Sequence, residues 1–176
     1  MWEPMAEDHI DRFLKRVADI DAEIDLEVEG IVDRIGGINR RIHNALKETL
    51  VEYDLTPEDW HVLSHLRLRK DGRPSTPGAL ARSLDLSSGA MTSRLDRLEK
   101  LGHIRRLPDP GDRRGVLVEM TPEGVTAWDA AATVQARKEA FFASALSPAE
   151  QKRLNALLRK IMLAFEAREP PGSHKD

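Results

Sequence analysis

The chain has 176 residues, a length that suits one domain with a sizeable hydrophobic core. Apolar residues make up 40% and charged residues 32%, which indicates a globular, helix-rich protein, and no run of 18 apolar residues predicts a membrane span. Because the chain has no cysteine, a disulfide framework, a thiolate metal site and a thiol switch are excluded. The acidic start lacks the basic region of a signal peptide, so we expect a cytoplasmic protein that does not bind membranes.

The net charge of −3 is distributed unevenly along the chain. Residues 1–35 hold four basic and eleven acidic side chains, whereas residues 73–115 hold nine basic and five acidic ones. The positive charge is therefore concentrated in one central segment, as a surface that faces phosphate groups requires.

Apolar residues at helical spacing predict two N-terminal helices. The first stripe consists of Ile10, Phe13, Leu14, Val17 and Ile20, and the second of Val28, Ile31, Ile35, Ile38, Ile42, Leu46 and Leu50. Gly36-Gly37 interrupts the second stripe, and each glycine costs roughly 1 kcal/mol against alanine in a helix. The pair allows either a kink or the close approach of another backbone.

Four later helices are expected to begin at the same dipeptide, a hydroxyl residue followed by proline. The hydroxyl caps the orphan backbone donors, and proline at the first helical position lacks a donor that would go unused. The four pairs are Thr56-Pro57, Thr76-Pro77, Thr121-Pro122 and Ser147-Pro148. The last two predict long C-terminal helices over 122–146 and 148–167, followed by a disordered tail, 168–176.

The middle of the chain has the order of a winged helix-turn-helix. A short helix, Thr76–Leu84, precedes a turn and a second helix, Ser88–Leu101, which ends at Gly102. We expect a strand over 104–107, a polar loop over 108–114 and a returning strand over 115–120. The predicted fold class is mainly α with a small β-hairpin, the wing.

This order predicts a DNA-binding surface. A major groove admits a helix such as 88–101, whose candidate contacts to bases or phosphates are Ser88, Thr92, Ser93 and Arg97. Arg113 and Arg114 in the loop would enter a flanking minor groove and respond to its negative potential. Two alternatives stay open: the helix face is merely solvated, or one of the arginines pairs with Asp112 and stiffens the loop.

Three blocks in this order resemble the MarR (multiple-antibiotic-resistance regulator) family. They read LTPEDWHVLSHL, LDLSSGAMTSRLDRLEKLGHIRR and DPGDRRGVLVEMTPEG. The resemblance implies a homodimeric regulator, more often a repressor, that binds a palindromic operator and responds to a small ligand between the dimer region and each DNA-binding lobe. Helices in residues 1–54 and 121–167 would interlock in the dimer, residues 55–120 would form the lobe, and Arg114 would be the principal wing contact.

One subgroup of this family has an additional N-terminal helix and responds to urate or related anions. By resemblance its pocket arginines fall on Arg94 and Arg106, but His61 stands where the subgroup has an acidic residue, which puts urate itself in doubt. Trp60 and His43 are further candidates for an anionic or aromatic ligand. Core packing of Trp60 and a DNA contact by Arg94 are the alternatives.

Other functions have weaker support in the sequence. His61 and His65 have the i, i+4 spacing of a metal-binding pair, but no third ligand is evident, so we expect no metal and no cofactor. A winged helix that binds protein instead of DNA is a second alternative, against which the basic central segment argues. We expect no enzymatic activity, because the sequence holds no Ser-His-Asp arrangement and no phosphate loop.

Overall fold

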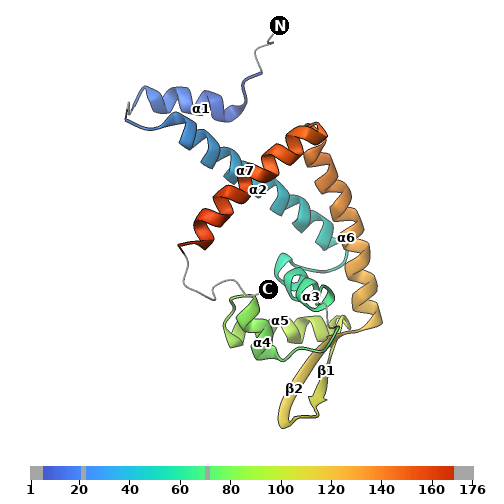
Figure 1. Ribbon diagram of the computed structural model, residues 1–176. Helices are drawn as coiled ribbons and strands as arrows, with labels where there is room; N and C mark the ends of the chain where they lie inside the picture. The colour runs from blue at the N-terminus through green and yellow to red at the C-terminus, as the bar shows by residue number, and fades with distance from the viewer. Residues whose placement is uncertain (1–5, 21–22, 70–71, 169–176) are drawn as a thin grey trace. The chain divides into compact units, whose positions relative to one another are not determined.

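The computed structural model describes residues 6–20, 23–69 and 72–168 and divides into two compact units, Met1–Leu46 and Lys47–Asp176 (Figure 1). The first unit holds α1 (His9–Ala18) and most of α2 (Leu26–Val51). The second holds the remaining elements. The predicted disordered tail lies outside the described residues apart from Arg168.

The two helices of the first unit pack closely. Asp8 caps α1, since its Oδ1 accepts the backbone N–H groups of Ile10 at 2.8 Å and Asp11 at 2.9 Å. Gly30 lies where the helices approach, because a Cβ there would be 3.2 Å from Leu14 Cδ1. α2 itself runs unbroken through Gly36-Gly37.

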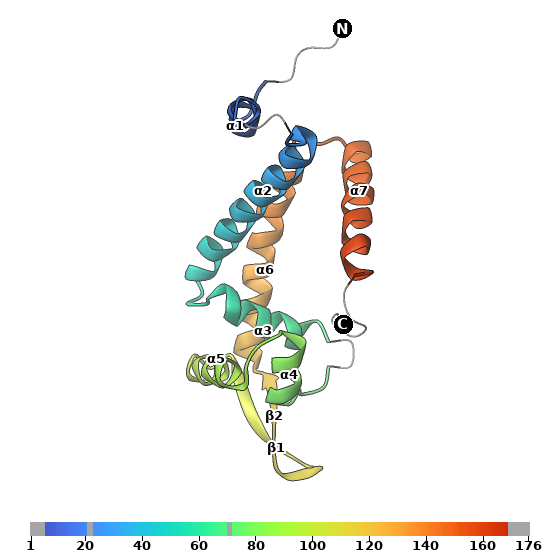
Figure 2. The same ribbon diagram turned by 90° about the vertical axis from the view of Figure 1, so that its left-hand side faces the viewer.

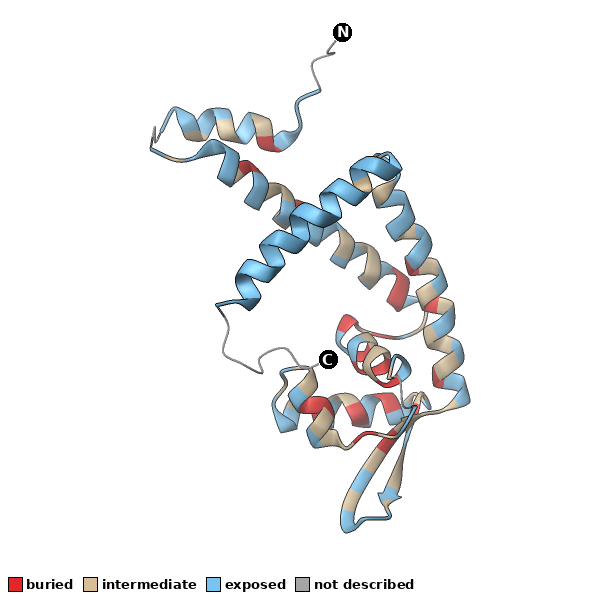
Figure 3. Cartoon of the chain, viewed as in Figure 1, coloured by how far each residue is buried: buried red, intermediate tan, exposed pale blue. Residues whose placement is uncertain are grey.

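The lobe with the winged helix-turn-helix order expected from the sequence lies in the second unit. Its elements are α3 (Pro57–Arg67), α4 (Pro77–Ser83), α5 (Ser88–Lys100), β1 (Ile104–Asp109) and β2 (Asp112–Met120). The mainly helical fold class with a small wing is confirmed. The lobe encloses a core that includes Leu63, Leu80, Met91, Leu95, Leu98, Ile104 and Val118, each at most 2% exposed (Figure 3).

The expected starts of the later helices are confirmed. Each hydroxyl caps its helix by accepting the backbone N–H three residues on: Ala79 for Thr76, Gly124 for Thr121, and Glu150 for Ser147. Thr56 accepts from Asp59 in the same way, and the Asp59 side chain accepts the N–H of Thr56 in return, which completes a capping box.

The wing differs from its expected bounds. β1 and β2 pair antiparallel and leave only residues 110 and 111 as the turn, so the prediction of a loop over 108–114 is wrong. Pro108 lies on β1 opposite Val116, which is tolerated because both strands of a two-stranded sheet are edge strands. The hairpin projects beyond the helices of the lobe (Figures 1 and 2).

The C-terminal helices are α6 (Pro122–Ala143) and α7 (Pro148–Glu166). α6 begins against the turn between α5 and β1, where a Cβ on Gly124 would lie 2.0 Å from the carbonyl oxygen of His103. Further along, Trp128 of α6 stacks on Trp60 of α3, with ring centroids 5.1 Å apart and planes 8° from parallel. The Trp128 indole also donates to Ser64 Oγ at 2.8 Å. These contacts join α6 to the lobe.

Candidate nucleic-acid interface

α5 has one buried and one exposed face. Met91, Leu95 and Leu98 are buried, whereas Ser88, Thr92 and Ser93 are exposed. The Thr92 hydroxyl donates to the carbonyl oxygen of Ser88 at 2.9 Å, which leaves its lone pairs and its methyl group to face a partner. The first acidic side chain of the helix is Asp96, so its N-terminal half presents hydroxyls to an anion without a competing carboxylate.

The wing arginines lie on β2 rather than in the turn. Arg113 and Arg114 are both exposed, and they lie where the register is irregular, between Asp112, which pairs with Asp109, and Val116, which pairs with Pro108. Asp112 Oδ1 accepts the backbone N–H of Arg114 at 2.9 Å, and Asp109 Oδ1 accepts that of Gly111 at 2.8 Å. These two carboxylates therefore order the turn through the backbone.

Arg97 follows Ser93 by one helical turn on α5, but its guanidinium is bound by Asp59 and Asp54. Its Nε donates to Asp59 Oδ2 at 2.9 Å, and its Nη2 donates to the carbonyl oxygen of Asp54 at 2.5 Å and to Asp54 Oδ1 at 3.1 Å. The hydrogen bond to Asp59, followed by that to Asp54, raises the pKa of Arg97 above its ordinary value. Sequence spacing places Arg97 on the helix but could not reveal these partners.

Arg106 fastens the wing to α5. Its guanidinium on β1 donates to two carboxylates of α5, Asp96 Oδ1 at 2.7 Å and Glu99 Oε2 at 2.5 Å. Arg105 pairs across the hairpin with Glu119 at 2.6 Å. Of the residues expected to bind a ligand, Arg106 is thus engaged by two carboxylates.

The other ligand candidates are only partly brought together. The pKa of the Glu58 carboxyl is lowered, chiefly by a backbone hydrogen bond and then by a hydrogen bond from the Thr56 side chain. The charges of Arg94 and His61 lower it further. The sequence did not single out Glu58. Trp60 is engaged in the indole stack, and His43 lies on α2 in the first unit. Among the described residues, no group of three or more potential metal ligands is found.

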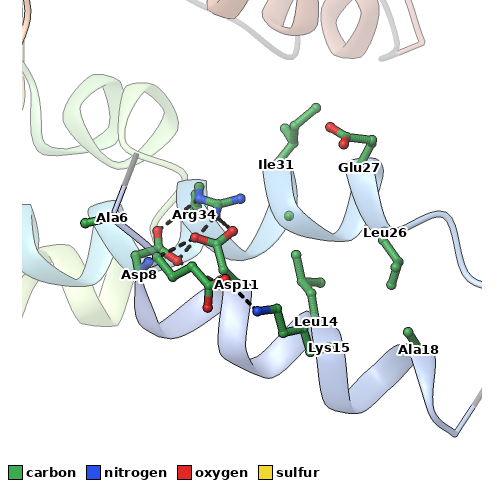
Figure 4. A pocket seen from close by; sticks show the side chains of 12 residues that line it. Ala6, Asp8, Asp11, Leu14, Lys15, Ala18, Leu26, Glu27, Ile31 and Arg34 are labelled. Atoms are coloured by element: carbon green, nitrogen blue, oxygen red, sulfur yellow. Dashed lines mark hydrogen bonds and ion pairs between the residues drawn. The ribbon is translucent and has the colours of Figure 1, made fainter. Parts of the chain in front are cut away.

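A groove of about 730 Å³ lies between α1 and α2 of the first unit (Figure 4). The Arg34 guanidinium bridges Asp8 and Asp11 at one end of it, and Leu14, Leu26 and Ile31 line the rest. The pKa of Asp8 falls to about 2, chiefly because it accepts the backbone N–H of Asp11, with Arg34 as a further cause. No motif in the sequence predicts this groove.

Known proteins similar to this chain show the family to which it belongs. Residues 53–115 match the model of the MarR family. The HTH-type transcriptional regulator PecS of Dickeya dadantii (strain 3937) is 30% identical over 139 residues, which cover 79% of this chain and 84% of PecS. The chain belongs to the MarR family. The multiple antibiotic resistance protein MarR of Salmonella typhimurium is 39% identical over 87 residues, 49% of this chain and 58% of that protein.

Solved structures of MarR-family proteins have the same fold. A mutant of MarR from E. coli is 30% identical, with a TM-score of 0.64 over 74% of this chain and 94% of that one. The structure of this mutant in complex with operator DNA has a TM-score of 0.62 at 30% identity, over 77% of this chain and 95% of that one. MepR, a transcription regulator of the Staphylococcus aureus multidrug efflux pump MepA, has a TM-score of 0.66 over 74% of this chain and 95% of that one. Because it is only 22% identical, it supports the fold alone.

These findings confirm the resemblance to the MarR family. The protein is a winged helix-turn-helix, DNA-binding transcription regulator and not an enzyme. The family match spans α3, α4, α5 and β1 and ends within β2, so it contains the hydroxyl face of α5 and both wing arginines. None of the helices in the described ranges is long and apolar enough to cross a membrane.

Proposed function

We propose that this MarR-family protein is a homodimeric repressor that binds a palindromic operator and is released by a small ligand. The observation that carries the proposal is the pairing, within one lobe, of an exposed hydroxyl face on α5 with two exposed arginines on the adjoining wing. Because its target is DNA, we place the protein in the cytoplasm.

α5 would lie in a major groove with Ser88, Thr92 and Ser93 toward base edges or phosphates. Arg113 and Arg114 would reach the flanking minor groove, where a guanidinium senses groove width and negative potential. Arg97 is left out of the contact surface, since its Nε and Nη2 donors are bound by Asp59 and Asp54. The hydroxyl face would select the site and the wing would hold the protein on it.

The homodimer is supported by apolar surface that one chain leaves uncovered. The structure describes all of α7, and none of its residues is buried. The helix nevertheless carries apolar residues at helical spacing, each at least 37% exposed: Leu154, Leu157, Leu158, Ile161 and Phe165. In the first unit, α2 exposes a comparable set: Val28, Ile31, Val32, Ile35 and Ile38. A second copy of the chain would cover these faces, and its two-fold symmetry would match half-sites about one helical turn apart.

The ligand would be an anion or a planar aromatic molecule with an anionic group. His61 on α3 and Arg94 on α5, whose charges both act on Glu58, supply donors, and Trp60 and Arg106 remain candidates for the same ligand. Such a ligand releases the operator only if it binds better to a form of the dimer whose lobes no longer match successive grooves.

The DNA contacts can be tested by salt dependence. Because each phosphate contact releases counterions, Arg114→Ala should lower the affinity for many sequences and reduce the salt slope by about 1. Arg137→Ala, which removes an exposed arginine from α6, is the matched control and should leave the slope unchanged. An unchanged slope for Arg114→Ala would remove the wing from the contact surface. Ser93→Ala should instead change the sequence preference at constant slope.

The ligand site can be tested by thermal shift with a panel of aromatic and carboxylate metabolites. A hit should raise the Tm of the wild-type protein, lose most of that shift in Arg94→Gln and weaken operator binding. Stabilisation by zinc but by no organic acid would instead support a metal-responsive regulator that uses His61 and His65.

A further inference from the structure

Arg97 joins α5 to a buried carboxylate on α3. Asp59 is 1% exposed, and its Oδ2 accepts both the Arg97 Nε–H at 2.9 Å and the backbone N–H of Thr56 at 3.0 Å. A carboxylate so far from water is costly unless a cation pairs with it. The Asp59 side chain is itself held in place, because it belongs to the capping box that starts α3.

The same guanidinium reaches the turn that precedes α3. Asp54 has a φ of 52°, the left-handed conformation, and both its carbonyl oxygen and its Oδ1 accept from Arg97 Nη2. One side chain of α5 thus makes three hydrogen bonds to two consecutive segments of the chain. A planar guanidinium can make these bonds only in a narrow range of orientations.

The rest of the α5 contact with the lobe is less directional. Met91, Leu95 and Leu98 are buried apolar side chains, which determine the face that α5 turns inward. Because hydrophobic burial is non-directional, they hold the rotation of the helix less narrowly than hydrogen bonds do. A recognition surface, however, has to be held within about 0.5 Å and 10–20° of its productive geometry. Arg97 and, on the opposite flank, the pair between Asp96 and Arg106 supply the directional contacts.

We propose that Arg97 is a positioning residue, which sets the rotation of α5 through Asp59 and Asp54 and so determines operator selectivity without touching DNA. The proposal rests on the proposed placement of α5 in a major groove. It replaces the base-reading role that the sequence favoured for Arg97. Selectivity then depends on Asp59, a buried residue of α3.

The test uses the full chain and a duplex that the wild-type protein selects from a random pool, with a scrambled duplex of the same composition as reference. Arg97→Gln and Asp59→Asn should each lower the selected-to-scrambled affinity ratio about tenfold at unchanged salt slope. The double variant should be no worse than either single one, because both break the same contact. Lys100→Gln, which removes an exposed charge from the same helix, should keep the ratio.

Two further measurements guard against a folding defect. Arg97→Lys keeps a cation beside Asp59 but cannot bridge to Asp54, so it should fold and lose part of the selectivity. Hydrogen exchange without DNA should show faster exchange of the α5 amides in Arg97→Gln, with the core of the lobe still protected.

Three results would overturn the inference. A salt slope reduced by about 1 in Arg97→Gln would show a phosphate contact. Full selectivity in Asp59→Asn together with its loss in Arg97→Gln would show direct base contact. Retained selectivity in both Arg97→Gln and Arg97→Lys would show that the ion pairs do not set the rotation. A wild-type protein that selects no duplex would instead contradict the proposed function itself, and with it the role given to Arg97.

Discussion

The lobe and the last helix contain the same kinds of apolar side chain but bury them to opposite extents. Leu95 in the lobe is fully buried, whereas Leu157 on α7 is 51% exposed. The lobe completes its core within one chain, with Leu63, Leu80 and Ile104 packed around α5. α7 carries an apolar face that one chain leaves in water. A helix of this kind gains most of its stability from packing, so the contrast indicates which part of the molecule depends on a partner.

The same substitution made in both regions tests this difference most severely. Leu95→Ala opens a cavity in the closed core of the lobe and should lower the free energy of unfolding by about 2–5 kcal/mol. Leu157→Ala should cost much less at low protein concentration and more as the concentration rises, because its packing depends on a second chain. Denaturant unfolding at two protein concentrations measures both. Equal, concentration-independent losses would contradict the contrast.

The junction between the lobe and α6 should be nearly as sensitive. In Gly124→Ala the new Cβ would clash with the carbonyl oxygen of His103, 2.0 Å away, and we expect a loss of about 1–3 kcal/mol as the start of α6 shifts. Gly89→Ala is the matched control, since no heavy atom lies within 4 Å of its Cβ position and alanine favours a helix by about 1 kcal/mol. Thermal unfolding should lower the Tm of the first variant and raise that of the second. A Tm unchanged in Gly124→Ala would mean that the junction is not closely packed.

The smallest expected effect is a pH dependence that originates within the lobe. Burial, with the charge of Arg69 as a second cause, lowers the pKa of His65 from 6.5. The folded state therefore favours the neutral imidazole, so this contribution to stability is complete above about pH 6.5 and declines as the pH falls below it. In His65→Gln the unfolding free energy should decline less steeply between about pH 7 and 5. Identical slopes in the two proteins would show that His65 is as hydrated in the folded state as in the unfolded one.

Local chemistry made much of the lobe predictable from its sequence. Each pair of a threonine or serine followed by proline begins a helix where expected, because a cap and its helix are neighbours in the chain. Gly102, with a φ of 74°, follows the end of α5, where the left-handed conformation favours glycine. The wing was predicted as a hairpin but with a loop that was too long, since Pro108 interrupts a strand pattern without interrupting an edge strand.

The contacts of the candidate site were not predictable in the same way. Arg97 and Asp59 are 38 residues apart, and no local spacing indicates that they pair. The Trp60–Trp128 stack and the groove between α1 and α2 likewise depend on how distant segments pack. The charge distribution marks the basic central segment. It could not distinguish Arg113 and Arg114, which are exposed, from Arg97 and Arg106, which pair with carboxylates.

The central claim, that two chains complete the molecule and read DNA together, is tested most directly by sedimentation equilibrium with and without the selected duplex. We expect the wild-type protein to have twice the mass of one chain and to bind as two chains per duplex. Leu158→Asp, which places a charge on the apolar face of α7, should sediment as a folded single chain and lose the selected duplex. A wild-type protein that sediments as a single chain and binds the duplex one to one would contradict the account.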